Sequence, residues 1–336
     1  MDFLELDNEQ RRQTVDARQI HEAFWRASDE LRHRFDGSMR WVTRKGRDYL
    51  HRKRGSHERS LGPRSAQTEQ QYEAFMRGRE RCRSDVQRLG ARLDKMAPVN
   101  RALNLGRVPK LTARILRKLD QHSLLGQHLL VVGTNALFAY EARAGVHLPA
   151  DLLSTQDADL LWDVRSRIEL LVPEVRRSGI LALLQAVDHS FRQRDRGDFR
   201  ALNRDGMLVD LIRPADSTLV RSGARRTLGE SEDDLHGAPI DGLQWLLNVP
   251  RFEAVAVAED GYAVRLVTVD PRAFALHKLW VSARPDRDPL KRPRDRAQAR
   301  AAAALASTYL GLSLEDEALS GLPEAIRVHA GELIAP

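Results

Sequence analysis

The spacing of apolar residues predicts a strand–turn–helix unit near the middle of the chain. Four consecutive apolar residues, Leu129–Val132, are typical of a buried strand, and Gly133-Thr134 follows them directly. Apolar residues then recur at the spacing of one helix face, at Ala136, Leu137 and Tyr140. We therefore expect the strand to turn at Gly133-Thr134 into a helix.

Further apolar runs extend this unit into a larger core. One run contains Asp157-Ala158-Asp159 and predicts a second strand. A helix is expected from Ser166 to about Arg192, and a strand pair at Phe199–Asn203 and Met207–Ile212. The pattern favours an α+β core, with a mixed β-sheet and helices, that runs from about residue 127 to residue 215.

The region before this core reads as helices and a hairpin. The periodicity of residues 5–35 predicts a long helix. Residues 38–52 predict a β-hairpin with Lys45-Gly46 at its turn and Trp41 and Tyr49 as cross-strand partners.

The following segments alternate between loops and helices. Gly55–Arg64 is expected to be an irregular basic loop, and Ser65 to about Met96 a long charged helix. Pro98 and Pro109 should flank a linker, after which Lys110–Leu125 predicts a short basic amphipathic helix.

The C-terminal part is predicted to contain a second hairpin and several helices. Residues 216–240 are expected to form a long mobile loop, and Leu243–Leu247 a short helix. The hairpin should join Phe252–Val257 to Tyr262–Val267 around Asp260-Gly261, and helices should fill 271–284 and 290–310.

Composition narrows the class of protein. A chain of 336 residues is long enough for two or three domains with a sizeable core. The polar start, and the lack of an apolar run long enough to cross a bilayer, predict a cytoplasmic protein without a membrane partner. A single cysteine, Cys82, excludes an intramolecular disulfide and a cysteine-based zinc site.

The positive charge is concentrated in one segment. The chain carries 54 Lys and Arg against 47 Asp and Glu, a net charge of +7. Residues 38–64 alone hold nine Lys or Arg and two acidic residues, so 9 − 2 = +7, and the remainder balances to zero. A local excess of this kind indicates a polyanionic partner.

Paired carboxylates and a glycine turn are the strongest candidate chemistry. Asp157 and Asp159 lie two residues apart on a predicted strand and should point to the same side of it. Like charges so close together are costly unless a cation lies between them, and Mg²⁺ prefers carboxylate oxygens. The Gly133-Thr134 turn before a helix is suited to binding a phosphate.

This order of motifs resembles the DNA-polymerase-beta-like nucleotidyltransferase superfamily. Its signature is an apolar strand, a Gly-Gly or Gly-Ser turn, an Asp-x-Asp strand and a third carboxylate on a later strand, here Asp210. The chain departs from it in having Thr134 at the turn and a long spacing from Gly133 to Asp157. The resemblance implies that Asp157, Asp159 and Asp210 are catalytic and hold two Mg²⁺ ions.

A second constellation is similar to an element of toxin-type and aminoglycoside-type nucleotidyltransferases. Lys278 on one predicted helix would bind the triphosphate, and Lys291 or Arg294 at the start of the next would add charge. Asp295 would orient one of these cations. The overall order looks closest to an uncharacterised bacterial group with this fold.

The basic hairpin predicts a nucleic-acid interface, although cations on an exposed hairpin can also serve only to protect an edge strand. Cations that contact phosphates, interleaved with rings that stack on bases, are the usual nucleic-acid pattern. The candidates share this hairpin: Trp41, Arg44, Lys45, Arg47, Tyr49, Arg52 and Lys53.

Together these features predict an Mg²⁺-dependent nucleotidyltransferase that moves a nucleoside monophosphate from an NTP to a hydroxyl, on an RNA 3′ end or a protein side chain. Two alternatives stay open: a non-catalytic nucleic-acid-binding protein on a transferase-like core, and a small-molecule transferase of the antibiotic-modifying kind. We expect a helical N-terminal region at 1–100, the transferase core at 101–215, and a C-terminal extension at 216–336 that completes the NTP site.

Overall fold

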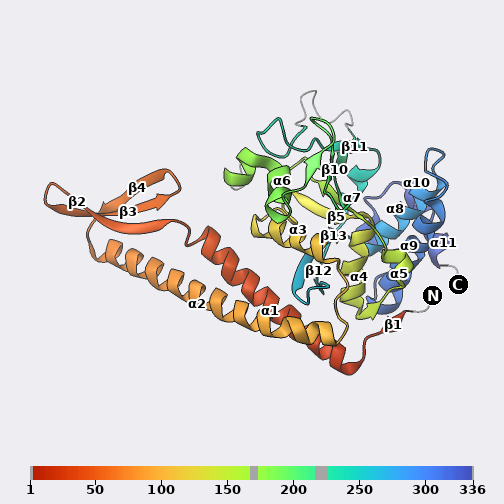
Figure 1. Cartoon of the computed structure of the whole chain (residues 1–336), viewed down its shortest axis with the longest axis horizontal. Coiled ribbons are helices and arrows are strands. Elements are labelled where there is room, and N and C mark those ends of the chain that lie inside the picture. Colours follow the sequence, from red (N-terminus) through yellow and green to blue (C-terminus); the bar gives the residue numbers. More distant parts are fainter. Residues whose placement is uncertain (1–2, 167–172, 216–225, 335–336) are drawn as a thin grey trace.

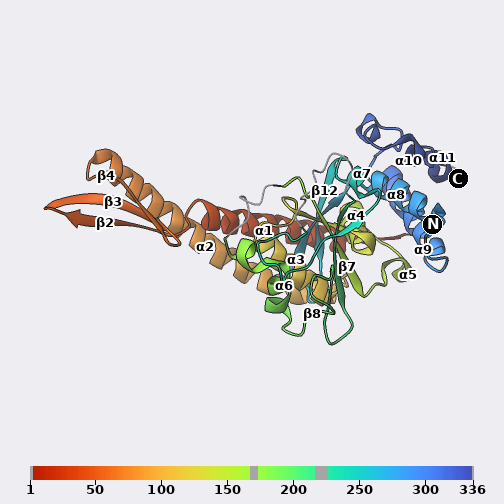
Figure 2. The same cartoon turned by 90° about the horizontal axis from the view of Figure 1, so that it is seen from above.

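The protein consists of a mixed α/β core with a long helical arm that projects from it (Figure 1). The computed structural model describes residues 3–166, 173–215 and 226–334. Seen from above, a small β-sheet lies at the far end of the arm and the C-terminal helices lie at the opposite end of the molecule (Figure 2). The expected α+β class is confirmed.

The arm is a pair of long helices, α1 (Asn8–His33) and α2 (Ala66–Ala102), that lie side by side. Each begins with a capping box, in which the side chains of Asp7 and Ser65 accept hydrogen bonds from the backbone of the first turn. A small apolar cluster that includes Phe35, Phe75 and Cys82 packs at the end of the pair. The arm therefore has a core of its own.

The far end of the arm carries a three-stranded antiparallel sheet. It is built from β2 (Ser38–Arg44), β3 (Arg47–Arg54) and β4 (His57–Pro63), in the order β2-β3-β4. The predicted hairpin is confirmed, but the prediction of an irregular loop at Gly55–Arg64 is wrong. The residues of β4 are mostly polar, so they lack the apolar alternation that predicts a strand. The strand is stabilised mainly by backbone pairing with β3.

The predicted pairing of Trp41 with Tyr49 is also wrong. Trp41 lies opposite Leu50, and Tyr49 lies opposite Val42. Because side chains alternate between the two faces of a sheet, Trp41 and Tyr49 point to opposite sides. Trp41 packs against Tyr72 of α2 at a ring-centroid distance of 5.9 Å.

The prediction of a linker that begins at Pro98 is wrong. Pro98 lies inside the helix, which continues to Ala102. Tertiary contacts hold this last turn: the side chain of Asn100 donates a 2.7 Å hydrogen bond to the Gly261 carbonyl. A Cβ on Gly261 would lie 2.1 Å from the Ala97 carbonyl oxygen, so the glycine permits a close approach between α2 and the core.

The core is built on a six-stranded mixed sheet. Its strand order is β5-β7-β10-β9-β8, and β11 pairs with a further stretch of β10. The pairs β5–β7, β10–β9 and β9–β8 are antiparallel, whereas β7–β10 and β10–β11 are parallel. The strands are β5 (Leu129–Val132), β7 (Asp157–Trp162), β8 (Arg192–Gln193), β9 (Arg200–Leu202), β10 (Leu208–Pro214) and β11 (Ala238–Ile240).

Helices and two small sheets surround this central sheet. The helices of this part are α3 (Lys110–Gln121), α4 (Leu137–Ala144), α5 (Ala150–Leu153), α6 (Pro173–Val187) and α7 (Leu243–Leu246). The remaining strands are β1 (Leu4–Glu5), which pairs with β6 (Val146–His147), and β12 (Arg251–Val257), which pairs with β13 (Ala263–Val269). The predicted second hairpin is thus confirmed as β12–β13.

Two predicted segments are only partly described. Of the helix expected from Ser166 to Arg192, residues 167–172 lie outside the described residues, α6 is broken at Gly179 (φ 76°), and Arg192 begins β8. Of the loop expected at 216–240, residues 216–225 lie outside the described residues, and the prediction is wrong at Ala238–Ile240, which form β11.

The C-terminal region packs two helices together beside the sheet. These are α8 (Pro271–Ala283) and α9 (Arg292–Ala304), followed by a π-helical turn at Leu305–Tyr309. The short helices α10 (Glu324–Arg327) and α11 (Ala330–Ile334) complete the fold. In the described part of the chain, no helix is both long and apolar enough to cross a bilayer.

Candidate active site

A cavity of about 520 Å³ lies where the sheet meets α8 and α9, and it gathers the candidate residues of the core. Its walls include Gly133, Thr134, Asp157, Asp159, Asp210, Lys278, Lys291, Arg294 and Asp295. These side chains come from five elements that are far apart in the sequence. The carboxylates line the side of the sheet, and the cations line the side of the helices.

The carboxylates are brought together by strand pairing. Asp159 on β7 and Asp210 on β10 are partners in the parallel register, so they are lateral neighbours on one face of the sheet. Asp157 precedes Asp159 by two residues and shares that face. The two apolar runs of the sequence therefore place three acidic groups along one wall of the cavity.

Gly133 permits the close approach of the glycine turn to these acids. Its φ is 64°, and a Cβ at this position would lie 2.1 Å from the Oδ2 atom of Asp159. A larger residue would therefore be strained and would collide with the carboxylate. Residues Gly133–Ala136 form a 3₁₀ turn between β5 and α4, so the predicted turn leads directly into a helix.

The environment of Asp159 favours its protonated form. Burial, and after it the neighbouring carboxylates of Asp157 and Asp210, raise the pKa of Asp159 to about 7. The positive charges of Lys278 and Arg200 lower this pKa, but by less than burial and the two carboxylates raise it. A cation bound beside Asp159 would stabilise its ionised carboxylate and so remove the cost of ionising it.

The other two carboxylates have direct partners. The Thr155 hydroxyl donates to Asp157 Oδ1, and the Asn135 amide donates a 2.7 Å hydrogen bond to the Asp157 carbonyl. Asp210 is nearly buried, with 8% of its side chain exposed, and it accepts two hydrogen bonds from Arg200, at 2.7 Å to Oδ1 and 2.5 Å to Oδ2. This bidentate pair raises the pKa of Arg200.

Asp295 organises the cationic wall. Its buried carboxylate accepts a 2.8 Å hydrogen bond from Lys278 Nζ at Oδ1 and a 2.7 Å hydrogen bond from Arg287 Nε at Oδ2. Only 16% of the Lys278 side chain is exposed, so the carboxylate fixes the position of its ammonium group. Two cations are thereby held at the edge of the cavity by one acid.

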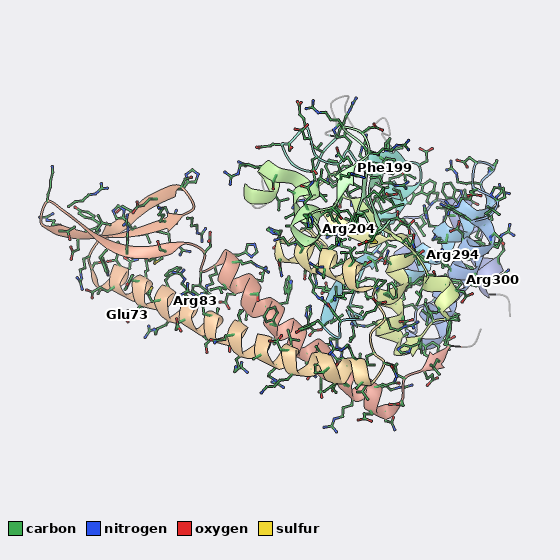
Figure 3. All side chains as sticks on the ribbon, in the orientation of Figure 1. Glu73, Arg83, Phe199, Arg204, Arg294 and Arg300 are labelled. Carbon is green, nitrogen blue, oxygen red and sulfur yellow. The ribbon has the colours of Figure 1, made fainter. Side chains whose placement is uncertain are left out.

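Lys291 and Arg294 lie at the start of α9. Arg294 donates to the backbone carbonyl of Ser154, which ties α9 to the segment before β7. Figure 3 shows Arg294 on the core, far along the molecule from Glu73 and Arg83 on the arm. Lys291 is exposed at the rim of the cavity.

Three polar residues of this site were not predicted from the sequence. Arg287 lies in the loop between α8 and α9 and contributes a cation, and Arg200 holds Asp210. Gln298 on α9 donates hydrogen bonds to the Thr134 hydroxyl at 3.1 Å and to the Leu152 carbonyl at 2.8 Å. Gln298 lies three residues after Asp295, in an Arg-Asp-x-x-Gln segment, whereas Arg200 and Arg287 lie in no motif with recognisable spacing.

The donor chemistry of the acidic wall suits a divalent metal. Asp157 and Asp159 offer carboxylate oxygens to the cavity, and the raised pKa of Asp159 indicates a site that lacks positive charge. Within the described residues, no group of three or more acidic, histidine or cysteine side chains is arranged to hold a metal ion. Arg200 donates a hydrogen bond to each oxygen of Asp210, and its positive charge opposes metal binding by that carboxylate.

The candidates on the arm lie on a separate surface. Residues 44, 45, 47 and 49 line a hollow on the face of the sheet that carries Tyr49 and His51. Arg52 points to the other face, where it donates to the carbonyls of Arg34 and Asp36 and lies over the Phe75 ring. Trp41 and Arg52 therefore face the arm helices, and the outer face bears Arg44, Arg47, Tyr49 and Lys53.

Comparison with known proteins agrees with the geometry of the core. A nucleotidyltransferase family model matches residues 110–322, which span β5, β7, β10, α8 and α9. Neither curated proteins nor solved structures give a match. The match covers more than half of the 336 residues and includes the acidic wall, the glycine turn and the cationic wall. The chain belongs to this nucleotidyltransferase family.

Proposed function

We propose that the protein is an Mg²⁺-dependent nucleotidyltransferase that moves a nucleoside monophosphate from an NTP to a hydroxyl group of a nucleic acid. The observation that carries this proposal is one cavity with carboxylates on one wall and Lys278, Arg287 and Lys291 on the other. An NTP needs both walls. Its phosphates require cations, and its reacting phosphorus requires groups that stabilise the negative charge of the transition state, which here would be a metal ion held by the carboxylates.

The cationic wall is suited to bind the triphosphate. Lys278 and Arg287 share one buried carboxylate, so each retains hydrogen atoms that can donate to phosphate oxygens. The backbone of the Gly133-Thr134 turn would bind phosphate from the opposite side. Gln298 orients the Thr134 hydroxyl, and Lys291 and Arg294 add positive charge at the rim.

The acidic wall is suited to the chemical step. We propose that Asp157 and Asp159 hold Mg²⁺, which would neutralise charge on the phosphates and lower the pKa of the acceptor hydroxyl. Asp210, once released from Arg200, would accept the proton of that hydroxyl. The new bond joins the acceptor oxygen to the α-phosphorus, the bond to the β-phosphate oxygen breaks, and pyrophosphate leaves.

The outer face of the arm sheet supports a nucleic acid as the acceptor. Arg44, Lys45, Arg47 and Lys53 have no ion-pair partner in the described part of the chain, whereas Arg40 pairs with Glu58. Unpaired cations around a tyrosine favour a polyanion with stacking bases. We propose that Trp41 and Arg52 contribute indirectly, since they hold the sheet on the helices.

The length of the arm restricts the acceptor to a large molecule. The 37 residues of α2 span about 55 Å at 1.5 Å per residue. A molecule held at the arm sheet must bridge much of this length to present a hydroxyl to the cavity. A folded RNA can do so, and a small antibiotic cannot.

The acceptor can be identified by following labelled nucleotides. The protein would be incubated with each NTP labelled at the α-phosphate, Mg²⁺, total cellular RNA and a protein extract. We expect the label to enter material that nuclease degrades and protease does not. Label that resists nuclease but is released by protease would instead indicate a protein hydroxyl, as in toxin-type nucleotidyltransferases, and would contradict the nucleic-acid proposal.

A further inference from the structure

A second cavity, of about 550 Å³, lies between the arm and the core and is separate from the proposed active site. The arm helices α1 and α2 form one side, and α3 with the start of β13 forms the other. This volume lies in the range of small-molecule pockets, which is roughly 300–1,000 Å³. None of the residues assigned to nucleotidyl transfer lines it.

Aromatic and aliphatic side chains provide flat apolar walls. Phe24 and Trp25 on α1 face Leu93 on α2 and Tyr262 near β13. Phe24, Trp25, Leu93 and Tyr262 are only partly buried, and the guanidinium groups of Arg265 and Arg117 lie over the rings of Trp25 and Tyr262, at 4.9 and 5.7 Å from the ring centroids. Gly90 on α2 also lines the cavity and, having no side chain, occupies none of its volume. Such walls suit a planar, mostly apolar ligand.

Three polar groups around the cavity have no hydrogen-bond partner among the residues that the structure describes. They are buried nitrogens of His21 (Nε2), Trp25 (Nε1) and Arg32 (Nε). Burial and the nearby Arg117 and Arg265 lower the pKa of His21 to about 4, so its ring is neutral at pH 7. Buried polar atoms without partners are rare, and a ligand that reaches them would satisfy them.

The charges of the cavity favour an anion. Arg117 is paired with Asp260, and Arg265 is paired with Asp120 and Glu253. Among the described residues, by contrast, no carboxylate forms an ion pair with Arg32; burial lowers the pKa of its guanidinium, and the charges of Asp29 and Asp120 offset only part of this effect. A guanidinium that burial destabilises more than its neighbouring carboxylates stabilise it would gain from a bound anion.

We propose that this cavity binds a small aromatic anion, with its rings between Phe24, Trp25 and Leu93 and its anionic group on Arg32. The ligand would contact both the arm and the core. The arm is already tied to the core beside this site, because Asp94 on α2 accepts a 3.0 Å hydrogen bond from the Tyr262 hydroxyl. This site is independent of the proposed transfer reaction.

Anilinonaphthalene sulfonate, which combines aromatic rings with one anionic group, is a suitable probe. Its fluorescence would be titrated against the full-length protein, with excitation of tryptophan to detect energy transfer from Trp25. We expect saturable binding of one probe per chain. An excess of NTP with Mg²⁺ should leave the bound probe in place, whereas displacement by NTP would locate it in the active site and overturn the proposal.

Two variants locate the site. Arg32→Gln removes the counter-charge and should weaken binding by about tenfold or more. Gly90→Leu should abolish it, because a Cβ at Gly90 would make an ordinary van der Waals contact with Phe24, at 3.7 Å, and the longer side chain would extend into the cavity that Gly90 lines. Replacing a helical glycine also favours the helix, so the fold should be retained.

Matched controls separate this site from general probe binding. Arg59→Gln removes an exposed arginine of β4, and Gly331→Leu enlarges an exposed glycine of α11 with nothing within 4 Å. Both should bind the probe like the unmodified protein. If the unmodified protein binds no probe saturably, or if Arg32→Gln and Gly90→Leu both bind it normally, the cavity is not a ligand site.

Discussion

Arg200 and Asp210 lie directly opposite each other on β9 and β10, and the guanidinium donates a hydrogen bond to each oxygen of the carboxylate. The third acidic group of the cavity is therefore neutralised by an arginine. The proposed function has this pair open, because the guanidinium occupies one lone pair on each carboxylate oxygen and its positive charge repels a metal ion.

Replacing Arg200 should strengthen metal binding. Arg200→Gln frees the carboxylate of Asp210 and removes a positive charge from the cavity, so Mn²⁺ affinity should rise by about tenfold, or ~1.4 kcal/mol. Electron paramagnetic resonance of free Mn²⁺ measures this affinity without reference to catalysis. Arg204→Gln, which changes an exposed arginine beyond β9 (Figure 3), should leave it unchanged. An unchanged or weaker affinity in Arg200→Gln would show that the arginine does not compete with the metal.

Stability without divalent metal should fall as the pH rises from about 4 to about 7. The folded state raises the pKa of Asp159 to about 7, from a usual value near 3.8, so over this range the folded chain holds a proton that the unfolded chain has lost. Asp159→Asn should lack this fall in stability. At pH 8 its Tm should be higher than that of the unmodified protein, by about 2–4 °C for each kcal/mol gained in the free energy of unfolding.

The same experiment tests the cation site. Thermal unfolding would be followed at pH 5 and pH 8, with a chelator and then with Mg²⁺. Mg²⁺ should restore stability at pH 8 to the unmodified protein and have little effect on Asp159→Asn. An equal response of both proteins to Mg²⁺ would argue that the metal binds elsewhere.

Lys278 should be important for NTP affinity. Lys278→Ala removes the ammonium group that Asp295 positions, and NTP binding should weaken by about 1.5–3 kcal/mol, or roughly ten- to a hundredfold. Isothermal titration with a non-hydrolysable NTP measures the change. Lys95→Ala, at an exposed position on α2, is the matched control. A dissociation constant that does not move in Lys278→Ala would remove this residue from the site.

The outer face of the arm sheet should determine the salt dependence of RNA binding. If Arg44, Lys45, Arg47 and Lys53 each contact one phosphate, the log-log salt slope for single-stranded RNA should be about −3. Replacing all four by Gln should flatten the slope and leave NTP affinity unchanged. Removing four charges elsewhere, at Arg83, Arg92, Lys95 and Arg300, should have a much smaller effect. Unmeasurable RNA binding at low salt would contradict the arm's proposed role.

The sequence was sufficient to predict elements whose apolar pattern is strong. The runs around Leu129–Val132 and Met207–Ile212 are β5 and β10, and the turn at Asp260-Gly261 joins β12 to β13. Because Asp157, Asp159 and Asp210 lie within or beside such runs, their convergence follows from strand pairing. Local patterns thus located most of the acidic wall.

Features that depend on tertiary contacts could not be predicted in the same way. The strand β4 has little apolar content and exists because β3 pairs with it, and α2 continues past Pro98 because Asn100 binds the core. Arg200 and Arg287 gain their roles from partners 10 and 8 residues away, across a strand pair and a helix start. No periodicity distinguishes such arginines from the many others in this chain.

Transfer of label from an NTP tests the central claim most directly. The protein would be incubated with Mg²⁺, RNA and an NTP labelled at either the α- or the γ-phosphate, beside Asp159→Asn. The account predicts that α-label becomes attached to the acceptor, that γ-label is released as pyrophosphate, and that Asp159→Asn lowers the rate by at least about 10²-fold. Attachment of γ-label, no transfer with any NTP and acceptor, or full activity of Asp159→Asn would contradict it.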